Sequence, residues 1–127
     1  MALAGFAKKY REDSEEEREH AMKLIEYQNK RGGRVVFNDI QKPEKFEWNS
    51  ALEAVEQTLA MEKAVHNSLL ELHRTADSHG DAQLTDFIEG EYLKEQVEGE
   101  KALGDLITKM KRAGDGLGLH IIDKELQ

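Results

Sequence analysis

The amino-acid sequence predicts an all-α fold, and three observations support this. Glu, Lys, Leu and Ala are abundant, and the 127 residues include a single proline, Pro43, which favours helix over strand. Apolar residues recur at alternating three- and four-residue spacing over long segments, which is the period of one helix face. Most glycines stand outside these segments. A chain of this length is expected to form one domain with a modest core.

Four helical segments are expected, in the following order along the chain: residues 3–30, 51–77, 82–113 and 119–126. The first stops at Gly32 and Gly33. The second opens at Ser50 with Glu53 three residues later, a capping-box pattern that marks the start of a helix. The third breaks at the glycine-rich run that begins at Gly114, and a short apolar tail follows it.

The lengths of the connections constrain the topology. The link between 51–77 and 82–113 is only a few residues long, so these segments are expected to form an antiparallel pair. The loop 32–49 has about 18 residues and could stretch roughly 60 Å, more than the roughly 40 Å length of either helix that it joins. It can therefore cross the whole bundle and leave 3–30 and 51–77 parallel. Within this loop, residues 34–37 look extended and could lie along the bundle or pair with a copy of themselves.

Charge and residue types argue against several functional classes. The 26 acidic residues outnumber the 18 basic ones and give a net charge of -8, which disfavours nucleic-acid binding and favours attraction of cations. No apolar run approaches the roughly 20 residues that span a bilayer, and the first residues show no signal-peptide pattern. We therefore expect a soluble, cytoplasmic protein without a nucleic-acid or membrane partner. Since cysteine is absent, any metal would be held by oxygen and imidazole ligands.

The predicted inward faces of the three long helices are interrupted by polar residues near their middles. Glu17 and His20 occupy such positions on the first helix, Glu62 on the second and Gln96 on the third. An unpaired buried carboxylate is costly, and a bound cation would satisfy all of these groups at once. The Glu-x-x-His spacing also recurs in helical bundles that hold two iron ions. Taken alone, however, this spacing arises easily by chance in a glutamate-rich chain.

Other polar and aromatic residues have ordinary structural interpretations. His66 and His73 lie on the margin of the second inward face with no evident partner, so surface or groove positions are expected. Trp48 is expected to pack against other side chains, as are the methionines and tyrosines. Judged without further information, Asp86 and Glu89 read as a solvated helix start, which the helix macrodipole favours.

Three long stretches closely resemble eukaryotic heavy-chain-type ferritin. They read SEEEREHAMKLIEYQNKRGGRV, LEAVEQTLAMEKAVHNSLLELH and DFIEGEYLKEQVEGEKALGDLI, and the likeness extends over nearly the whole chain. The resemblance implies a four-helix bundle with a long crossing loop and a short fifth helix. It also implies assembly into a hollow shell of many subunits that oxidises ferrous iron with dioxygen and stores the ferric mineral.

The resemblance implies roles for the mid-helix residues in a di-iron centre that handles Fe²⁺ and Fe³⁺. Glu17 matches the carboxylate that bridges the two iron ions, and His20 matches the imidazole that binds one of them. Glu62 resembles the ligand of the second ion. Gln96 resembles the glutamine that forms a hydrogen bond near the centre.

Further acidic residues take roles in mineral formation and iron uptake by the same resemblance. Glu16 and Glu19 resemble cavity-side carboxylates where the mineral nucleates, and Met22 stands where the family has another glutamate. Asp86 and Glu89 match the acidic pair of the channel through which iron enters the shell.

The likeness also shows a departure, because the family has a further helix ahead of these residues, with a glutamate ligand and a tyrosine of the iron centre. Three of the four long bundle helices and the tail helix would then be present. The apolar groove left open would need another chain, so a homo-oligomer or a ferritin-like shell is expected rather than a monomer.

The leading expectation is therefore iron binding, ferrous iron oxidation and ferric iron storage as a ferritin-like subunit. The alternative is a catalytically impaired structural or assembly fragment of a ferritin shell. A third possibility, a different di-iron oxidoreductase, would require a second Glu-x-x-His motif on 82–113, where the sequence reads KEQVEGE.

Overall fold

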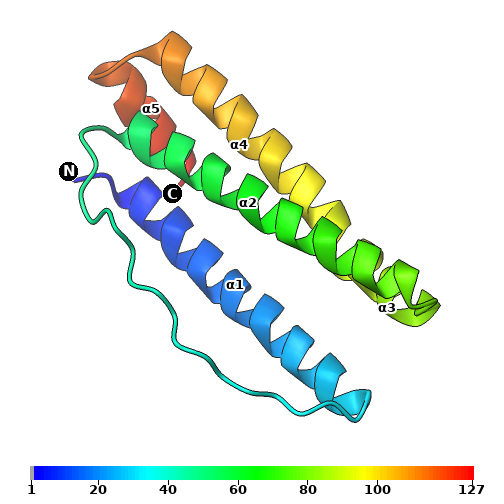
Figure 1. Ribbon diagram of the computed structural model, residues 1–127. Helices are drawn as coiled ribbons and strands as arrows, with labels where there is room; N and C mark the ends of the chain where they lie inside the picture. Colours follow the sequence, from blue (N-terminus) through cyan, green and yellow to red (C-terminus); the bar gives the residue numbers. More distant parts are fainter. Residues whose placement is uncertain (1) are drawn as a thin grey trace. The chain divides into compact units, whose positions relative to one another are not determined.

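The computed structural model describes residues 2–127, and within this range it contains helices and connecting segments but no strand (Figure 1). The helices, in chain order, are α1 (Ala4–Lys30), α2 (Ala51–Ser78), α3 (Ala82–Ile88), the π-helix η1 (Glu89–Leu93), α4 (Lys94–Ala113) and α5 (Leu117–Glu125). The predicted all-α fold is confirmed. None of these helices combines the length and apolar character that crossing a membrane requires.

The chain divides into two compact units. The first unit runs up to Phe46 and also includes Asp115–Gln127, so it contains α1 and α5. The second unit, Glu47–Gly114, contains α2, α3, η1 and α4.

In the first unit, α5 packs against the start of α1. The residue before α1, Leu3, provides no side-chain cap, and the buried Asp123 of α5 supplies one instead. The backbone N–H of Phe6 donates a hydrogen bond of 3.0 Å to Asp123 Oδ1. An acidic group at this place is favourable because the first N–H groups of a helix lack partners within the helix and carry the positive end of its dipole. The tail helix therefore caps a helix that begins more than a hundred residues earlier.

Only the first turns of α1 are buried. Phe6 is buried, whereas Leu24 and the predicted inward residue Glu17 are exposed. The reason lies in the length of α5, whose nine residues cover the beginning of α1 within this unit and no more.

Gly5 allows the close approach of α1 and α5, which leads to a first prediction. A Cβ atom added at Gly5 would lie 1.9 Å from the carbonyl oxygen of Asp123, so the two helices would have to separate. We expect Gly5→Ala to lower the free energy of unfolding by about 1–3 kcal/mol, as overpacking does. Gly104→Ala is the matched control, because a Cβ there meets nothing within 4 Å and alanine favours helix. Thermal unfolding followed by circular dichroism measures both, and a Gly5→Ala variant as stable as the unsubstituted chain would contradict the packing described.

The segment after α1 is extended and exposes apolar side chains. Gly32 adopts a positive φ of 77°, and residues 33–43 form neither helix nor strand. Val36, Phe37 and Ile40 all lie in this stretch, and Phe37 and Ile40 are 81% and 97% exposed. Pairing of this segment with a copy of itself stays a prediction.

The second unit is a helical hairpin in which α3, η1 and α4 return antiparallel to α2 (Figure 1). Ser50 caps α2 by accepting a hydrogen bond from the N–H of Glu53, as the capping-box pattern predicted. The reciprocal bond differs, because the Glu53 carboxylate accepts from the N–H of Asn49 rather than from that of Ser50. The turn between α2 and α3 uses Gly80 at a φ of 66° and Asp81 as the cap of α3.

The predicted helix 82–113 is continuous but contains the π-helical turn η1. Ile88 and Tyr92 are buried there and form a core cluster with Leu69 of α2. Phe87 packs edge-on against Tyr92, with 5.6 Å between the centres of the two rings. Further along, Gly99, three residues after the buried Gln96, is exposed. Glu100 takes the inward place because the buried face advances by four residues from Gln96 rather than by three.

Tyr92 gives the fold a dependence on alkaline pH. Its burial, together with the negative charges of Glu91 and Glu95, raises the pKa of the phenol from 10.0 to about 12. The folded chain therefore holds this proton at pH values where the unfolded chain has released it. The stabilisation is complete below about pH 10 and is lost as the pH rises towards about 12.

We expect Tyr92→Phe to reduce this alkaline loss of stability, because phenylalanine keeps the ring and has no proton to release. Urea unfolding at several alkaline pH values measures the effect, with Tyr10→Phe as the control. If the Tyr92→Phe variant lost stability with pH as steeply as the unsubstituted chain, Tyr92 would not be the cause.

Candidate functional site

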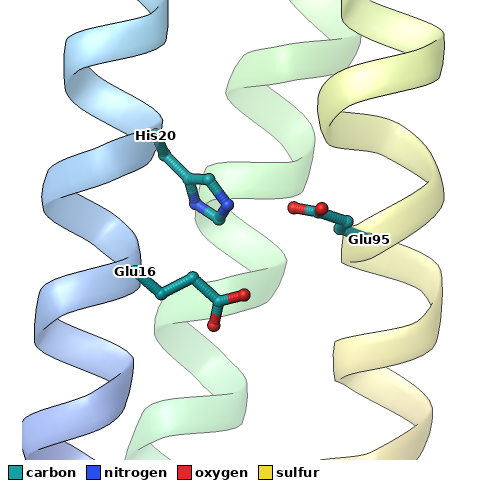
Figure 2. Close-up of side chains that lie close together, drawn as sticks. All are labelled: Glu16, His20 and Glu95. Atoms are coloured by element: carbon teal, nitrogen blue, oxygen red, sulfur yellow. The ribbon is translucent and has the colours of Figure 1, made fainter.

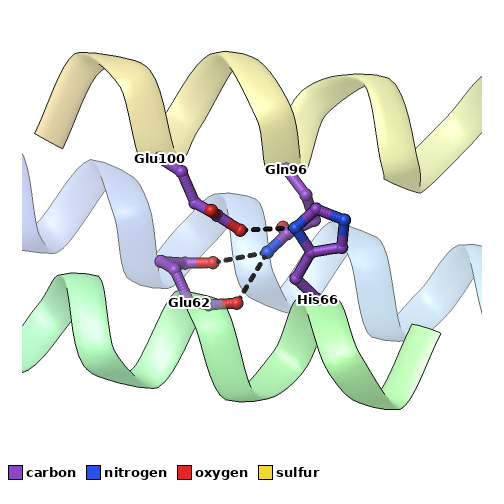
Figure 3. A network of polar contacts seen from close by, with 4 residues as sticks. All are labelled: Glu62, His66, Gln96 and Glu100. Atoms are coloured by element: carbon purple, nitrogen blue, oxygen red, sulfur yellow. Dashed lines mark hydrogen bonds and ion pairs between the residues drawn. The ribbon is translucent and has the colours of Figure 1, made fainter. Parts of the chain in front are cut away.

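Four polar side chains meet between α2 and α4 at the middle of the hairpin (Figure 3). Gln96 Nε2 donates hydrogen bonds to Glu62 Oε2 at 3.0 Å and to the Glu62 carbonyl oxygen at 3.1 Å. His66 Nδ1 lies 2.5 Å from Glu100 Oε1. Gln96 is buried, and the other three residues are partly buried. The hairpin therefore holds a polar cluster between its two helices.

The register of the helices explains why these four residues meet. Glu62 and His66 are four residues apart on α2, and Gln96 and Glu100 are four residues apart on α4, so each pair lies on one face. Because the helices are antiparallel, Glu62 lies opposite Glu100 and His66 lies opposite Gln96, and the two links cross one another (Figure 3). All four side chains therefore converge on one place.

The sequence pointed to two of these residues and missed the other two. Glu62 and Gln96 were expected at mid-helix positions, and the structure brings them together. No partner of His66 was evident from the sequence, and in the structure it pairs with Glu100. The four-residue spacing from Glu62 to His66 and from Gln96 to Glu100 was the signal that could have revealed this pair.

A second group of possible metal ligands lies on α1. His20 Nδ1 is 3.4 Å from Glu17 Oε1, and a ligand atom of Glu16 lies within 4.8 Å of one of His20. Figure 2 shows Glu16 and His20 one turn apart on the same side of α1; the drawn Glu95 belongs to α4, in the second unit. Glu16, Glu17 and Glu19 are exposed, whereas His20 is partly buried. Two carboxylates from the preceding turn of the same helix thus lie close to this imidazole.

The predicted channel residues lie in the second unit, near the turn between α2 and α3. Asp86 and Glu89 are exposed and one turn apart. Glu89 Oε1 is 2.7 Å from His73 Nε2, so His73 has a partner that was not evident from the sequence. Asp86 is not part of a helix start, because α3 begins at Ala82 and is capped by Asp81. The explanation of Asp86 by the helix dipole is therefore weak.

Carboxylate oxygens and neutral imidazole nitrogens suit divalent first-row metal ions such as Fe²⁺, Mn²⁺ and Zn²⁺. Glu17 and His20 offer both kinds of ligand in the first unit, and Glu62 offers a carboxylate in the second. An all-helical fold with Glu-x-x-His on one long helix is typical of the class of helical-bundle proteins that hold metal ions between carboxylates.

The chain belongs to the ferritin family. Residues 1–113 match the family described as Ferritin-like domain, a match that covers most of the chain. The resemblance stated from the sequence is thereby confirmed, and it places the chain among iron-storage proteins.

Curated relatives agree with this assignment. The chain is similar to soma ferritin of Lymnaea stagnalis, with 56% identity over 125 residues. It is also similar to the ferritin middle subunit of Aquarana catesbeiana and to the ferritin heavy chain of Echinococcus granulosus, with 50% identity to each. Each match covers 98% of this chain and 72% of the relative.

Proposed function

We propose that this protein binds ferrous iron, oxidises it with dioxygen and stores the ferric product as a subunit of a ferritin-like assembly. The observation that carries the proposal is the pairing of Glu62 with Gln96 at the centre of the hairpin. These are the two hairpin positions that the ferritin resemblance assigns to the iron centre. The heavy-chain and middle-subunit names of the relatives are consistent with iron oxidation as well as storage.

Each proposed ligand has a separate role. Glu17 would bind both iron ions through its two carboxylate oxygens, and His20 would bind one of them through an imidazole nitrogen. Glu62 would bind the other ion, and the hydrogen bond from Gln96 Nε2 holds its carboxylate in place. The arrangement requires Glu17 and His20 to meet Glu62 around the iron, as the family resemblance implies.

Anionic ligands make the oxidation favourable. A carboxylate stabilises Fe³⁺ more than Fe²⁺, because its electrostatic attraction grows with the charge of the ion. Binding by Glu17 and Glu62 therefore lowers the energy of the product relative to that of the substrate. Each Fe²⁺ gives up one electron, and dioxygen accepts the electrons together with protons.

The remaining acidic residues would guide iron to and from this centre. Asp86 and Glu89 present carboxylates at the surface, where a channel for entering Fe²⁺ requires them. The exposed Glu16 and Glu19 would bind Fe³⁺ and start mineral growth. The net charge of -8 attracts cations towards the protein as a whole.

The experiment is an assay of dioxygen consumption after Fe²⁺ is added to the metal-free protein. We expect the protein to consume dioxygen faster than the same buffer without it, and to keep the ferric product in solution. If the rate equals that of buffer while the protein forms assemblies, the structural role considered as the alternative applies instead.

A further inference from the structure

The crossing pair of His66 and Glu100 has no role in the proposed iron centre. Both residues project into the hairpin rather than into solvent, since their side chains are only 22% and 21% exposed. Each lies within one turn of a buried apolar residue, Leu69 on α2 and Leu103 on α4. A pair with a purely structural role at these positions could be replaced by apolar side chains without loss of packing.

The charges of the cluster favour a cation. Glu62 and Glu100 are carboxylates, His66 is an imidazole and Gln96 is an uncharged amide, so the four side chains contain no lysine or arginine. Two carboxylates held close together between helices repel one another, and a divalent ion would neutralise both. The amide of Gln96 can offer its oxygen as a further ligand if it turns over.

The distances leave room for an ion after small movements. His66 Nδ1 and Glu100 Oε1 are 2.5 Å apart. A metal ion bound to both at about 2.0–2.2 Å in tetrahedral geometry would hold the two atoms about 3.4 Å apart. Side-chain rotations that increase the distance between these two atoms by about 1 Å would therefore admit the ion. The Glu62 carboxylate lies further away, since Glu62, His66 and Glu100 do not bring three ligand atoms within 4.8 Å of one another. It would join as a third ligand after releasing its bond to Gln96 and turning towards this pair.

We propose that His66, Glu100 and Glu62, with Gln96 beside them, form a binding site for a divalent transition-metal ion within the α2–α4 hairpin. One nitrogen and several oxygen ligands suit Zn²⁺, Co²⁺ or Fe²⁺ and do not suit soft ions. The site goes beyond the proposed iron centre because it uses neither Glu17 nor His20. Since Glu62 belongs to both, an ion here lies next to the position proposed for the second iron ion.

Co²⁺ binding tests the proposal, because its visible absorption reports the number and type of its ligands. The experiment uses a chain with Glu17→Ala and His20→Ala, which removes the ligands on α1. We expect this chain to bind about one Co²⁺ ion tightly, with a spectrum that shows imidazole ligation. Adding His66→Ala or Glu100→Gln should weaken this binding on the order of 10- to 100-fold.

Two further variants make the outcome decisive. His73→Ala removes the other imidazole–carboxylate pair of the hairpin and should leave Co²⁺ binding unchanged. His66→Gln keeps a hydrogen-bonding side chain, so it separates loss of the ligand from loss of the fold, which circular dichroism checks. The proposal is overturned if a folded His66→Ala or His66→Gln variant binds Co²⁺ with unchanged affinity and spectrum. The expected Co²⁺ binding, together with no iron oxidation by the unsubstituted protein, would contradict only the proposed function.

Discussion

Replacement of Glu17 by alanine is expected to slow ferrous iron oxidation on the order of tenfold or more. Loss of a residue that only supports a metal ligand already lowers affinity or activity on the order of tenfold, and Glu17 is proposed to be a ligand itself. Glu17 is proposed to bind both iron ions, so its removal affects the two ions at once. Glu16→Ala should change the initial rate far less, because Glu16 is assigned to mineral nucleation.

The two variants form a close match. Glu16 and Glu17 are adjacent on α1, both are exposed, and both lie near the His20 imidazole. A general effect of negative charge on iron attraction would therefore appear equally in both. Dioxygen consumption at the same iron concentration gives the initial rates, and equal rates for the two variants would contradict the division of roles.

Association of the chain with further copies is the second large effect that we expect. Phe37 and Ile40 are almost fully exposed on an extended segment, and Val36 lies beside them with most of its side chain in solvent. An exposed apolar stretch of this kind commonly marks a protein–protein contact. Burial of these side chains against a second copy would recover roughly 25 cal/mol for each Å² of apolar surface.

Light scattering at micromolar concentration should therefore give a mass well above the 14.5 kDa of one chain. Phe37→Asp should lower this mass, because it places a charge in the contact. Lys42→Asp, on the same segment, is a control that changes charge without removing an apolar side chain. A monomer of 14.5 kDa that melts cooperatively would contradict the expected association.

The sequence predicted features that depend on neighbouring residues. Breaks at Gly32 and Gly114 and the cap at Ser50 are local signals, and α1, α2 and α4 begin or end near them. Polar interruptions of apolar faces likewise pointed to Glu62 and Gln96. Each of these inferences needs only helical periodicity and the chemistry of one residue.

Features that depend on distant residues could not be read in this way. Asp123 caps α1 across 117 positions of sequence, and nothing near either residue signals this contact. The π-helical turn at Glu89–Leu93 has no distinctive residue pattern. The contact between His66 and Glu100 joins residues 34 positions apart, and it depends on a buried face that advances by four residues from Gln96 to Glu100.

The most direct test of the proposed iron centre is the position of iron in crystals of this protein soaked in Fe²⁺ without dioxygen. Anomalous scattering at the iron absorption edge locates each ion independently of the protein atoms. We predict strong iron peaks within about 2.0–2.5 Å of carboxylate oxygens of Glu17 and Glu62 and of an imidazole nitrogen of His20. Iron peaks at other places, with none bound by these three side chains, would contradict the account.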